Sequence, residues 1–368
     1  MDPLPYFPPA LFPLLEPGAL PIDVARQLDD PTVLAQIQAQ HLGPWVYYEL
    51  LHRKLTQAVS GRFLRTLRND YAVSFKNSER QEQEIRSVLA TLGAAGVEPI
   101  LLKGADLRRR LYPDPALRPM ADLDLLVSPS MAHRAQTALA YSGFRLSRLE
   151  TDPRPGFRER YESRLTFDPP PSQTLRVDLH WEIWATAGFY RLSYERLSEA
   201  AVPWKAGYFS ARRLSAEHLL MHLCLHTFND WGIPSSLQSA QQLVDLALAL
   251  RGLSLDWQKF LGEVTRFRCQ RPVYLVLRKL VQALPQTIPP GILENLSAYR
   301  SFWAERLVLG RRLWHFTDYF AVFYHHHRLP DLAFYIGAKI WPDVDYLIAL
   351  YGKPKRSLYL RQFLHKLR

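Results

Sequence analysis

The sequence predicts an α+β protein in which a small mixed sheet with flanking helices is preceded and followed by helical additions. Apolar side chains at every second position predict strands over residues 122–127 and 174–184. Apolar residues spaced three to five positions apart predict helices near both ends of the chain. We therefore expect a helical N-terminal region, a mixed core and a helical C-terminal domain, at residues 1–76, 77–210 and 211–368.

The N-terminal region is predicted to be extended at first and then helical. Residues 1–22 contain prolines throughout, which favours extended chain. Apolar spacing predicts helix over residues 23–58 and a long helix over residues 62–92. Gly93 and Gly96 end this helix, because glycine readily adopts the left-handed conformation that is common after a helix.

The core opens with a strand, a turn and a short helix. Residues 100–102 are an apolar run that is long enough for a buried strand and too short for a helix. Lys103-Gly104 ends the run, and residues 105–111 predict one or two helical turns. Pro113 and Pro115 stop this helix, because proline has no N–H to donate to a carbonyl one turn back.

The next strand carries two acids on one face. It alternates apolar residues at 123, 125 and 127 with Asp122 and Asp124. Side chains two positions apart on a strand point the same way, about 6–7 Å apart at their roots, so the two carboxylates project together. They repel each other unless a cation lies between them. A divalent ion that prefers oxygen ligands, Mg²⁺ or Mn²⁺, fits this position.

Further strands complete the predicted sheet. A helix over residues 128–141 leads to a strand over 144–149, and a polar loop at 151–160 leads to a strand over 161–167. The clearest alternation in the chain runs over residues 174–184. It predicts one half-buried strand with a polar face made of Arg176, Asp178, His180 and Glu182.

The C-terminal domain is predicted to be helical throughout. Ser215 caps a helix that continues to Phe228, and further helices are predicted over residues 236–251, 256–268, 271–284, 291–309 and 311–324. The tail from Tyr351 carries six Lys or Arg residues and no acid. We interpret it as a solvated basic helix or a frayed end, and a contact with RNA or a membrane surface is the alternative.

The segment from Pro99 to Val127, with the string KG…LYPDP.LRPM.D.DLLV, resembles a known family. A strand that ends in a glycine turn, a helix and a strand with Asp-x-Asp is similar to the core of the DNA polymerase β-like nucleotidyltransferases. The fuller string resembles a bacterial branch of that superfamily, the uncharacterised nucleotidyltransferases. The superfamily usually has Gly-Ser or Gly-Gly after the first strand. This chain has Lys103-Gly104-Ala105, so the serine that would contact a phosphate is missing.

The resemblance implies a metal-dependent transfer of a nucleoside monophosphate from an NTP such as ATP to a hydroxyl, with release of pyrophosphate. Such enzymes place three acids around two ions, here Mg²⁺ or Mn²⁺. Asp122 and Asp124 match the first two acids. Asp178 matches the third, which would hold the second ion and act as a base toward the acceptor hydroxyl. The alternative is that all three are ordinary strand acids. His180 is either a donor beside Asp178 or structural, and Glu182 is the substitute ligand.

Three residues are candidates for binding the triphosphate. Lys103 is a point charge at the turn where the phosphate would lie. Gly104 lets the backbone approach closely and opens a helix whose N-terminal amides favour an anion. Arg118 either reaches a phosphate or forms a salt bridge with Asp114 or Asp106.

Other functions also fit parts of the sequence. A glycosyltransferase uses Asp-x-Asp to hold Mn²⁺ and a nucleotide sugar, but it predicts a longer α/β sheet before the motif. A nucleotide-binding module would keep the fold without turnover. His218, His222 and His226 lie on one helix face and suit either zinc or packing near the site. Asp245 is expected near the same pocket or paired with an arginine. The His325–His327 run is a poor metal site, because consecutive helical residues point in different directions.

The composition permits an anionic partner. The formal net charge is +11 and the isoelectric point about 9.6, which suit a nucleoside triphosphate or a nucleic acid. Cys224 and Cys269 have no metal-binding spacing and predict no disulfide framework, so a reducing cytoplasm suits them. No apolar run approaches 18 residues, and the N-terminus lacks the basic lead that is typical of a signal peptide, so we expect a cytoplasmic protein without a membrane span. The acceptor is open: a small molecule, a protein side chain or an RNA end.

Overall fold

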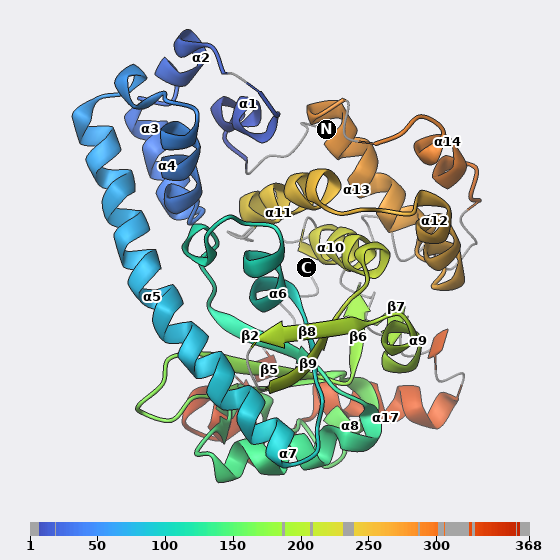
Figure 1. Cartoon of the computed structure of the whole chain (residues 1–368). Coiled ribbons are helices and arrows are strands. Elements are labelled where there is room, and N and C mark those ends of the chain that lie inside the picture. The colour runs from blue at the N-terminus through green and yellow to red at the C-terminus, as the bar shows by residue number, and fades with distance from the viewer. Residues whose placement is uncertain are drawn as a thin grey trace. The chain divides into compact units, whose positions relative to one another are not determined.

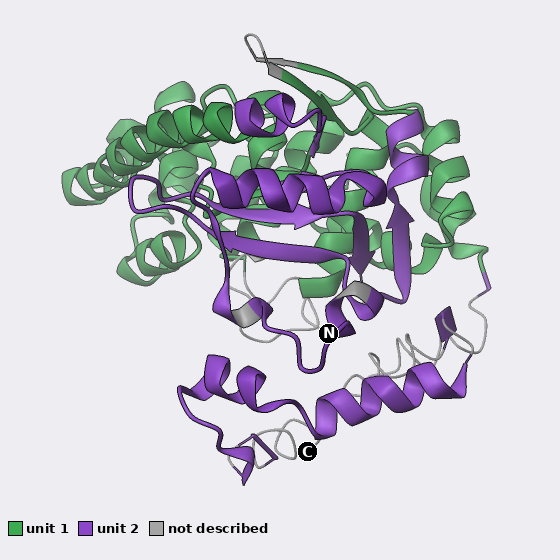
Figure 2. Cartoon of the chain, turned by 90° about the horizontal axis from the view of Figure 1, so that it is seen from below, with its two compact units in different colours: residues 1–88, 101–123, 200–299 green, residues 89–100, 124–199, 300–368 purple. Residues whose placement is uncertain are grey.

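A computed structural model gives the structure of the chain. It describes residues 7–18, 20–185, 188–206, 209–230, 239–285, 288–300, 305, 324–325, 328–357 and 359–360. The chain forms two compact units (Figure 2). Unit 1 comprises Met1–Val88, Leu101–Leu123 and Ala200–Tyr299, and unit 2 comprises Leu89–Ile100, Asp124–Glu199 and Arg300–Arg368. The domain boundaries expected from the sequence stay a prediction.

The α+β prediction is confirmed. Among the described residues, seven strands form one sheet with the order β3-β4-β5-β2-β1-β9-β8, and β6 and β7 form a second sheet. The strands of the first sheet are β1 (Ile100–Leu101), β2 (Asp122–Leu126), β3 (Arg145–Leu146), β4 (Arg164–Asp168), β5 (Arg176–His180), β8 (Val202–Ala206) and β9 (Phe209–Arg213). The second sheet contains β6 (Glu182–Ala185) and β7 (Tyr190–Ser193). The pairs β3/β4, β4/β5, β6/β7 and β8/β9 are antiparallel.

The N-terminal part of unit 1 is helical, and the expectation of extended chain over residues 1–22 is wrong for residues 9–15. Prolines are tolerated in a first helical turn, because the N–H they lack has no partner there anyway. The elements are η1 (Pro9–Leu11), α1 (Phe12–Leu15), α2 (Ile22–Arg26), α3 (Pro31–Ala39), α4 (Gly43–His52) and η2 (Thr56–Ala58). Asp30 caps α3, since its carboxylate accepts hydrogen bonds from the backbone N–H groups of Thr32 and Val33.

The long helix predicted over residues 62–92 is α5 (Gly61–Ala94), which spans 34 residues (Figure 1). It begins in unit 1 and ends in unit 2. Phe63 and Leu67 are buried on one side of its first turns, four positions apart, as the apolar spacing predicts. Ser74 and Ser78 continue this buried side, and apolar residues are buried again toward the end of the helix, at Ile85, Val88, Leu89 and Leu92.

The remaining elements of unit 1 include the short helix of the core and a helical bundle. After β1 come α6 (Lys103–Arg110) and η3 (Pro115–Leu117). The bundle contains α10 (Ala216–Asp230), α11 (Ser239–Gly252), α12 (Trp257–Arg266), α13 (Gln270–Ala283) and α14 (Ile292–Ser297). Helix α10 packs against α11, α12 and α13 and is buried along most of its length. Cys224 and Cys269 are both buried and unbridged.

Unit 2 packs helices against its part of the main sheet. Its further elements are η4 (Pro129–Met131), α7 (Ala132–Tyr141), η5 (Arg148–Glu150), α8 (Phe157–Tyr161), α9 (Tyr194–Glu199), α17 (Leu329–Ile340) and α18 (Val344–Tyr351). Helix α7 contacts β3 and β5. Helix α8 occupies the end of the predicted polar loop at 151–160, because Phe157 and Tyr161 pack against Tyr335 and Ala338 of α17.

Most of the predicted helices at 291–309 and 311–324 lie outside the described residues, as do residues 361–368 of the basic tail. Among the described residues, none of the helices has the length and apolar character needed to cross a membrane.

The single strand predicted over residues 174–184 is two strands. β5 ends at His180 and lies between β4 and β2, whereas β6 begins at Glu182 and pairs with β7 in the other sheet. Trp181 separates the two strands, and its backbone N–H donates to the backbone carbonyl of Ser163. The predicted polar face is also more enclosed than expected, because Asp178 and His180 are only 5% and 8% exposed.

Candidate active site

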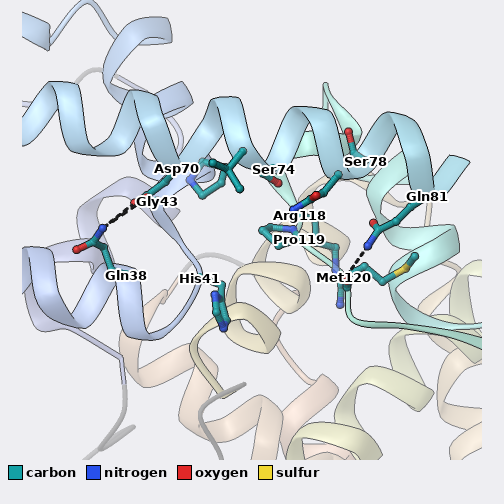
Figure 3. Close-up of a pocket in the computed structure, with 13 residues that line it drawn as sticks. Gln38, His41, Gly43, Asp70, Ser74, Ser78, Gln81, Arg118, Pro119 and Met120 are labelled. Atoms are coloured by element: carbon teal, nitrogen blue, oxygen red, sulfur yellow. Dashed lines mark hydrogen bonds between the residues drawn. The ribbon is translucent and has the colours of Figure 1, made fainter. Parts of the chain in front are cut away.

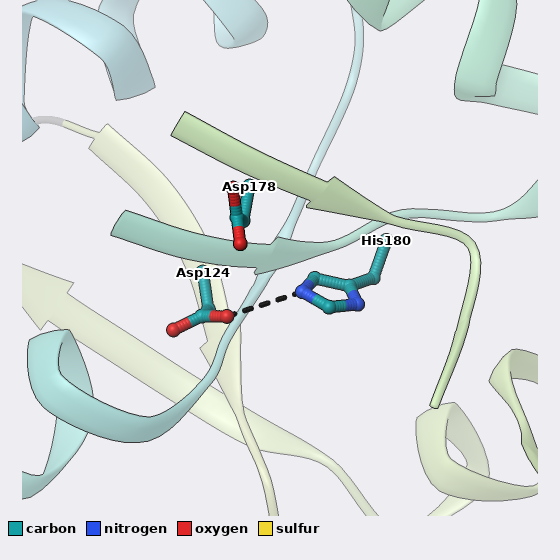
Figure 4. A group of neighbouring side chains, drawn as sticks. All are labelled: Asp124, Asp178 and His180. Atoms are coloured by element: carbon teal, nitrogen blue, oxygen red, sulfur yellow. Dashed lines mark hydrogen bonds and ion pairs between the residues drawn. The ribbon is translucent and has the colours of Figure 1, made fainter. Parts of the chain in front are cut away.

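Three side chains of unit 2 come together on neighbouring strands. Asp124 lies on β2, and Asp178 and His180 lie on β5. One ligand atom from each lies within 4.8 Å of the others, and all three side chains are buried. Figure 4 shows the side chains of Asp178 and Asp124 near each other on neighbouring strands and the imidazole of His180 pointing toward Asp124. Within the described ranges, this is the only group of three or more such side chains that could hold a metal ion.

Hydrogen bonds fix Asp124 and His180 in this arrangement. Nε2 of His180 lies 3.1 Å from Oδ1 of Asp124. The backbone N–H of Val127 donates to the carbonyl of His180 at 2.8 Å, which holds the end of β5 beside β2. His180 therefore contacts Asp124 on the neighbouring strand, so the imidazole orients the first carboxylate.

Asp178 is held from the opposite side by β4. Thr166 is its partner in the antiparallel register, and the Thr166 hydroxyl donates to Oδ1 at 2.7 Å. Nη1 of Arg164 lies 2.5 Å from Oδ2. The Arg164 side chain is 52% exposed, whereas that of Asp178 is 7% exposed. A guanidinium thus reaches in from the surface to neutralise a buried acid. Sequence reasoning missed both partners, because alternation gives a strand's faces but not its register.

The donor set suits a divalent cation. Buried carboxylates are costly unless a cation compensates them, and here Arg164 and His180 supply partners. Two carboxylates match the oxygen preference of Mg²⁺ and Mn²⁺, and an imidazole is more readily accepted by Mn²⁺ than by Mg²⁺.

The other predicted metal ligands are placed as follows. Asp122 is the first residue of β2 and is partly exposed. It lies two positions before Asp124, so both project from the same face of that strand. Glu182 begins β6 in the other sheet, where it accepts a hydrogen bond from Nε1 of Trp184. The metal roles of Asp122, Asp124 and Asp178 stay predictions.

The predicted phosphate-binding residues lie in unit 1. Lys103 is the first residue of α6, which therefore begins two residues earlier than predicted. Its φ of +41° is in the left-handed region, which is strained for a residue with a side chain. Gly104 follows in the first turn, where backbone N–H groups point out of a helix and favour an anion.

Arg118 forms its salt bridge with Asp245, not with Asp114 or Asp106. Its Nε and Nη2 donate to the Asp245 carboxylate at 2.8–3.1 Å, and the Tyr112 hydroxyl donates to the same carboxylate at 2.7 Å. Burial lowers the pKa of Arg118, but the adjacent Asp245 carboxylate outweighs burial, and the pKa rises above its usual value. Burial, and then Asp245, raise the pKa of Tyr112.

The arginine is aimed at the start of α6. A Cβ at Gly104 would lie 2.7 Å from Nη1 of Arg118 and 2.7 Å from Sδ of Met120. Asp245 uses the other two guanidinium nitrogens, so Nη1 is the one that lies against the Gly104 backbone. Gly104 is therefore required for this close approach. The sequence suggested an arginine partner for Asp245 but could not identify Arg118.

The three histidines of α10 are divided among different contacts in unit 1. Nε2 of His218 lies 3.0 Å from the Glu263 carboxylate. The rings of His222 and His226 stack with their centroids 6.3 Å apart, and Nε2 of His226 lies 3.1 Å from Nε2 of Gln242. His325 lies 3.2 Å from the Phe189 carbonyl, and residues 326–327 are outside the described residues.

Comparison with known proteins gives one family. A family model described as "Uncharacterised nucleotidyltransferase" matches residues 26–285. The structure is similar to that of an antigenic nucleotidyltransferase-like protein from Paracoccidioides brasiliensis, with a TM-score of 0.36 and 14% sequence identity. That similarity covers 62% of this chain and 97% of the other. A search of curated proteins found no match.

Proposed function

Because the chain belongs to the family of uncharacterised nucleotidyltransferases, we propose that it transfers a nucleoside monophosphate from an NTP to a hydroxyl group and releases pyrophosphate. The observation that carries the proposal is the buried group of Asp124, Asp178 and His180. Two acids and an imidazole within 4.8 Å of one another in a buried position are typical of sites that hold a cation or move a proton.

Asp122, Asp124 and Asp178 are the proposed ligands of Mg²⁺ or Mn²⁺. When bound, such ions neutralise charge on the triphosphate and lower the pKa of the attacking hydroxyl. His180 holds the Asp124 carboxylate in place at 3.1 Å, and Thr166 does the same for Asp178 at 2.7 Å. These contacts fix the direction of each carboxylate before a substrate arrives, which is the usual role of side chains behind a ligand shell.

Asp178 is the proposed base toward the acceptor. The hydroxyl oxygen forms a bond to the α-phosphorus, the bond from phosphorus to the pyrophosphate oxygen breaks, and the hydroxyl proton passes to the Asp178 carboxylate. The guanidinium of Arg164 must leave Oδ2 for this step, and its half-exposed side chain can turn toward solvent.

Lys103, Gly104 and Arg118 are the proposed binding site for the triphosphate. Three donors support this role: the Lys103 ammonium, the first-turn amides of α6 and Nη1 of Arg118, which lies against Gly104. Together they supply hydrogen-bond donors in place of the missing serine hydroxyl, and Lys103 adds a positive charge.

The Arg164–Asp178 ion pair also favours a second candidate, a nucleotide-binding module without turnover. If the guanidinium never leaves Asp178, no base is available, and NTP would bind without pyrophosphate release.

Incubation with each labelled NTP distinguishes the nucleotidyltransferase from the nucleotide-binding module. The protein is mixed with Mg²⁺ or Mn²⁺, alone and with cell extract, and both pyrophosphate and the labelled product are measured. The proposal predicts pyrophosphate and a mass increase of one nucleoside monophosphate on an acceptor, both lost in Asp124→Asn. NTP binding with no pyrophosphate under any condition would select the binding module.

A further inference from the structure

Unit 1 contains a pocket of about 340 Å³ with a mixed polar and apolar lining along one side of α5 (Figure 3). The end of α3 and the start of α4 form one wall, and the segment 118–120 before β2 forms another. Its lining residues are Gln38, His41, Gly43, Pro44, Asp70, Val73, Ser74, Asn77, Ser78, Gln81, Arg118, Pro119 and Met120. Figure 3 shows Asp70, Gln38 and His41 at one end and Arg118 and Met120 at the other.

Asp70 is a partly buried carboxylate that no Lys or Arg of the described chain approaches within 4.0 Å. Nε2 of Gln38 donates to it over long distances of 3.3 and 3.4 Å. Burial raises the pKa of Asp70, and Gln38 and His41 only partly offset this. The carboxylate therefore has a desolvation cost that its neighbours leave incompletely compensated.

The start of α4 is shaped around this carboxylate. A Cβ at Gly43 would lie 2.5 Å from Oδ2 of Asp70 and 2.8 Å from its Cβ. Any other residue at position 43 would displace the Asp70 side chain. The close approach fixes the carboxylate at its end of the pocket.

Several polar groups at the middle and the Asp70 end of the pocket keep hydrogen-bond acceptors available, whereas Arg118 keeps a donor at the other end. The hydroxyls of Ser74 and Ser78 donate to the carbonyls of Ala116 and Phe75, which leaves their lone pairs. Gln38 uses its amide N–H toward Asp70, which leaves its carbonyl oxygen. An occupant that matches these groups is rich in donors.

The pocket shares a residue with the proposed triphosphate site. Arg118 lines the pocket, and its Nη1 lies against Gly104 at the start of α6. Asp245 neutralises the arginine, so the charge at this end does not repel a cation. A molecule in the pocket would thus lie next to bound triphosphate.

We propose that this pocket binds the acceptor, and that the acceptor is a small polyhydroxylated molecule with an amino group whose ammonium pairs with Asp70. The inference rests on the proposed function and names its substrate class. An ammonium supplies three donors and the missing charge, and a charge-assisted hydrogen bond is about twice as strong as a neutral one. The carboxylate therefore selects an amine over a hydroxyl at its end, and a hydroxyl lies toward Arg118.

The test measures binding without NTP or metal ions. The full chain is titrated with D-glucosamine and with D-glucose, which differ in one amino group, by ligand-observed NMR. We expect glucosamine to bind at about 1 mM or tighter and at least about tenfold more tightly than glucose. Asp70→Asn should remove this preference, and Gly43→Ala should weaken glucosamine binding because its Cβ displaces the carboxylate. Glu79→Gln, which removes an acid from the exposed side of α5, should change nothing.

Equal binding of the two sugars, no binding of glucosamine, or an equal loss in Glu79→Gln would overturn the proposal. A second titration, with ATP, tests whether the pocket binds the nucleotide instead. A loss of ATP affinity in Asp70→Asn would place the adenine base of ATP in this pocket and overturn the proposal. The sugar titration involves no transfer, so a negative result would reject the acceptor proposal without contradicting the proposed reaction. Glucosamine binding without pyrophosphate release would reject the reaction alone.

Discussion

At Asp178, the contacts seen in the structure compete with the role proposed for the carboxylate in the reaction. Arg164 and Thr166 occupy it in this structure, whereas the proposed reaction needs it for an ion and a proton. The exposures differ, with 52% for the Arg164 side chain and 7% for that of Asp178, so the arginine can leave at little cost while the acid stays. Exposed ion pairs contribute little to stability, and half of this pair is exposed.

The first prediction separates the role of the Asp178 carboxylate from the effect of its ion pair with Arg164. Asp178→Asn should lower transfer by about 10²–10⁴-fold, the usual cost of losing a general base, with NTP affinity largely intact. Arg164→Gln should preserve transfer and tighten Mn²⁺ binding, because it removes the competing charge. Pyrophosphate release and calorimetric titration measure both effects. Full transfer in Asp178→Asn would exclude it as the base.

The second prediction concerns Asp245. Asp245→Asn should lower the free energy of unfolding by about 3–5 kcal/mol, because it leaves the buried Arg118 guanidinium without its charged partner. NTP affinity should fall as well, since Nη1 loses its orientation toward Gly104. Urea denaturation and NTP titration test these effects.

The double variant Arg118→Met/Asp245→Leu is the control for Asp245. It removes both charges, so it should be more stable than Asp245→Asn and still bind NTP poorly. A double variant less stable than the single one would contradict the assignment.

The third prediction follows from the raised pKa of Asp70. The folded protein holds this proton more tightly than the unfolded chain, whose carboxyl has the ordinary value of 3.8. The contribution of the protonated Asp70 to the free energy of unfolding is therefore lost as the pH rises through the raised pKa. Relative to wild type, Asp70→Asn should gain stability between pH 3.8 and neutrality and gain none below that range. Urea denaturation across this pH range measures the difference. A constant difference at all pH values would mean that the pKa is not raised.

Sequence reasoning at this scale found acids but not their partners. Alternation in two strands was enough to place Asp124 and Asp178 on polar faces. Nothing local indicated that Arg118 pairs with Asp245, because the two are 127 positions apart and paired by packing of α11.

At the scale of elements, alternation located strand residues but not the point where a strand ends. Residues 174–184 alternate throughout, yet β5 and β6 belong to different sheets. Period two describes side-chain direction and contains no information about which neighbour supplies the hydrogen bonds. The start of α6 was also missed, because Lys103 has a positive φ that lysine rarely adopts.

The fourth prediction compares two helical glycines. Gly104→Ala should weaken NTP binding and destabilise the fold, because its Cβ would lie 2.7 Å from Arg118 and Met120. Gly93→Ala on α5 meets nothing within 4 Å and should stabilise the protein by about 0.4–1 kcal/mol. Thermal denaturation and NTP titration of both variants test the pair. Identical behaviour would show that space at position 104 is unimportant.

At the scale of the whole molecule, each compact unit is assembled from three separate chain segments. A sequence is naturally divided into consecutive domains, and our expected boundaries do so. The boundary after residue 76 falls inside the continuous helix α5. Composition could not reveal interleaving, because contacts between distant segments leave no local signal.

The fifth prediction tests whether the expected core, residues 77–210, folds without the rest of the chain. A fragment of residues 77–210 lacks Asp245 and the helices α10–α14 that belong to unit 1. We expect it to show no cooperative unfolding transition by circular dichroism, while the full chain does. A cooperative transition in the fragment would support the consecutive domains instead.

The salt bridge between Arg118 and Asp245 can form during protein synthesis only after the ribosome has added Asp245. The two residues are 127 positions apart, so a ribosome that adds about 5–20 residues per second delivers the acid roughly 6–25 s after the arginine. During that interval the nascent chain presents a cation and the stretch leading to β2 to chaperones and proteases. Synonymous codons between positions 118 and 245 would lengthen or shorten this exposure without changing an amino acid.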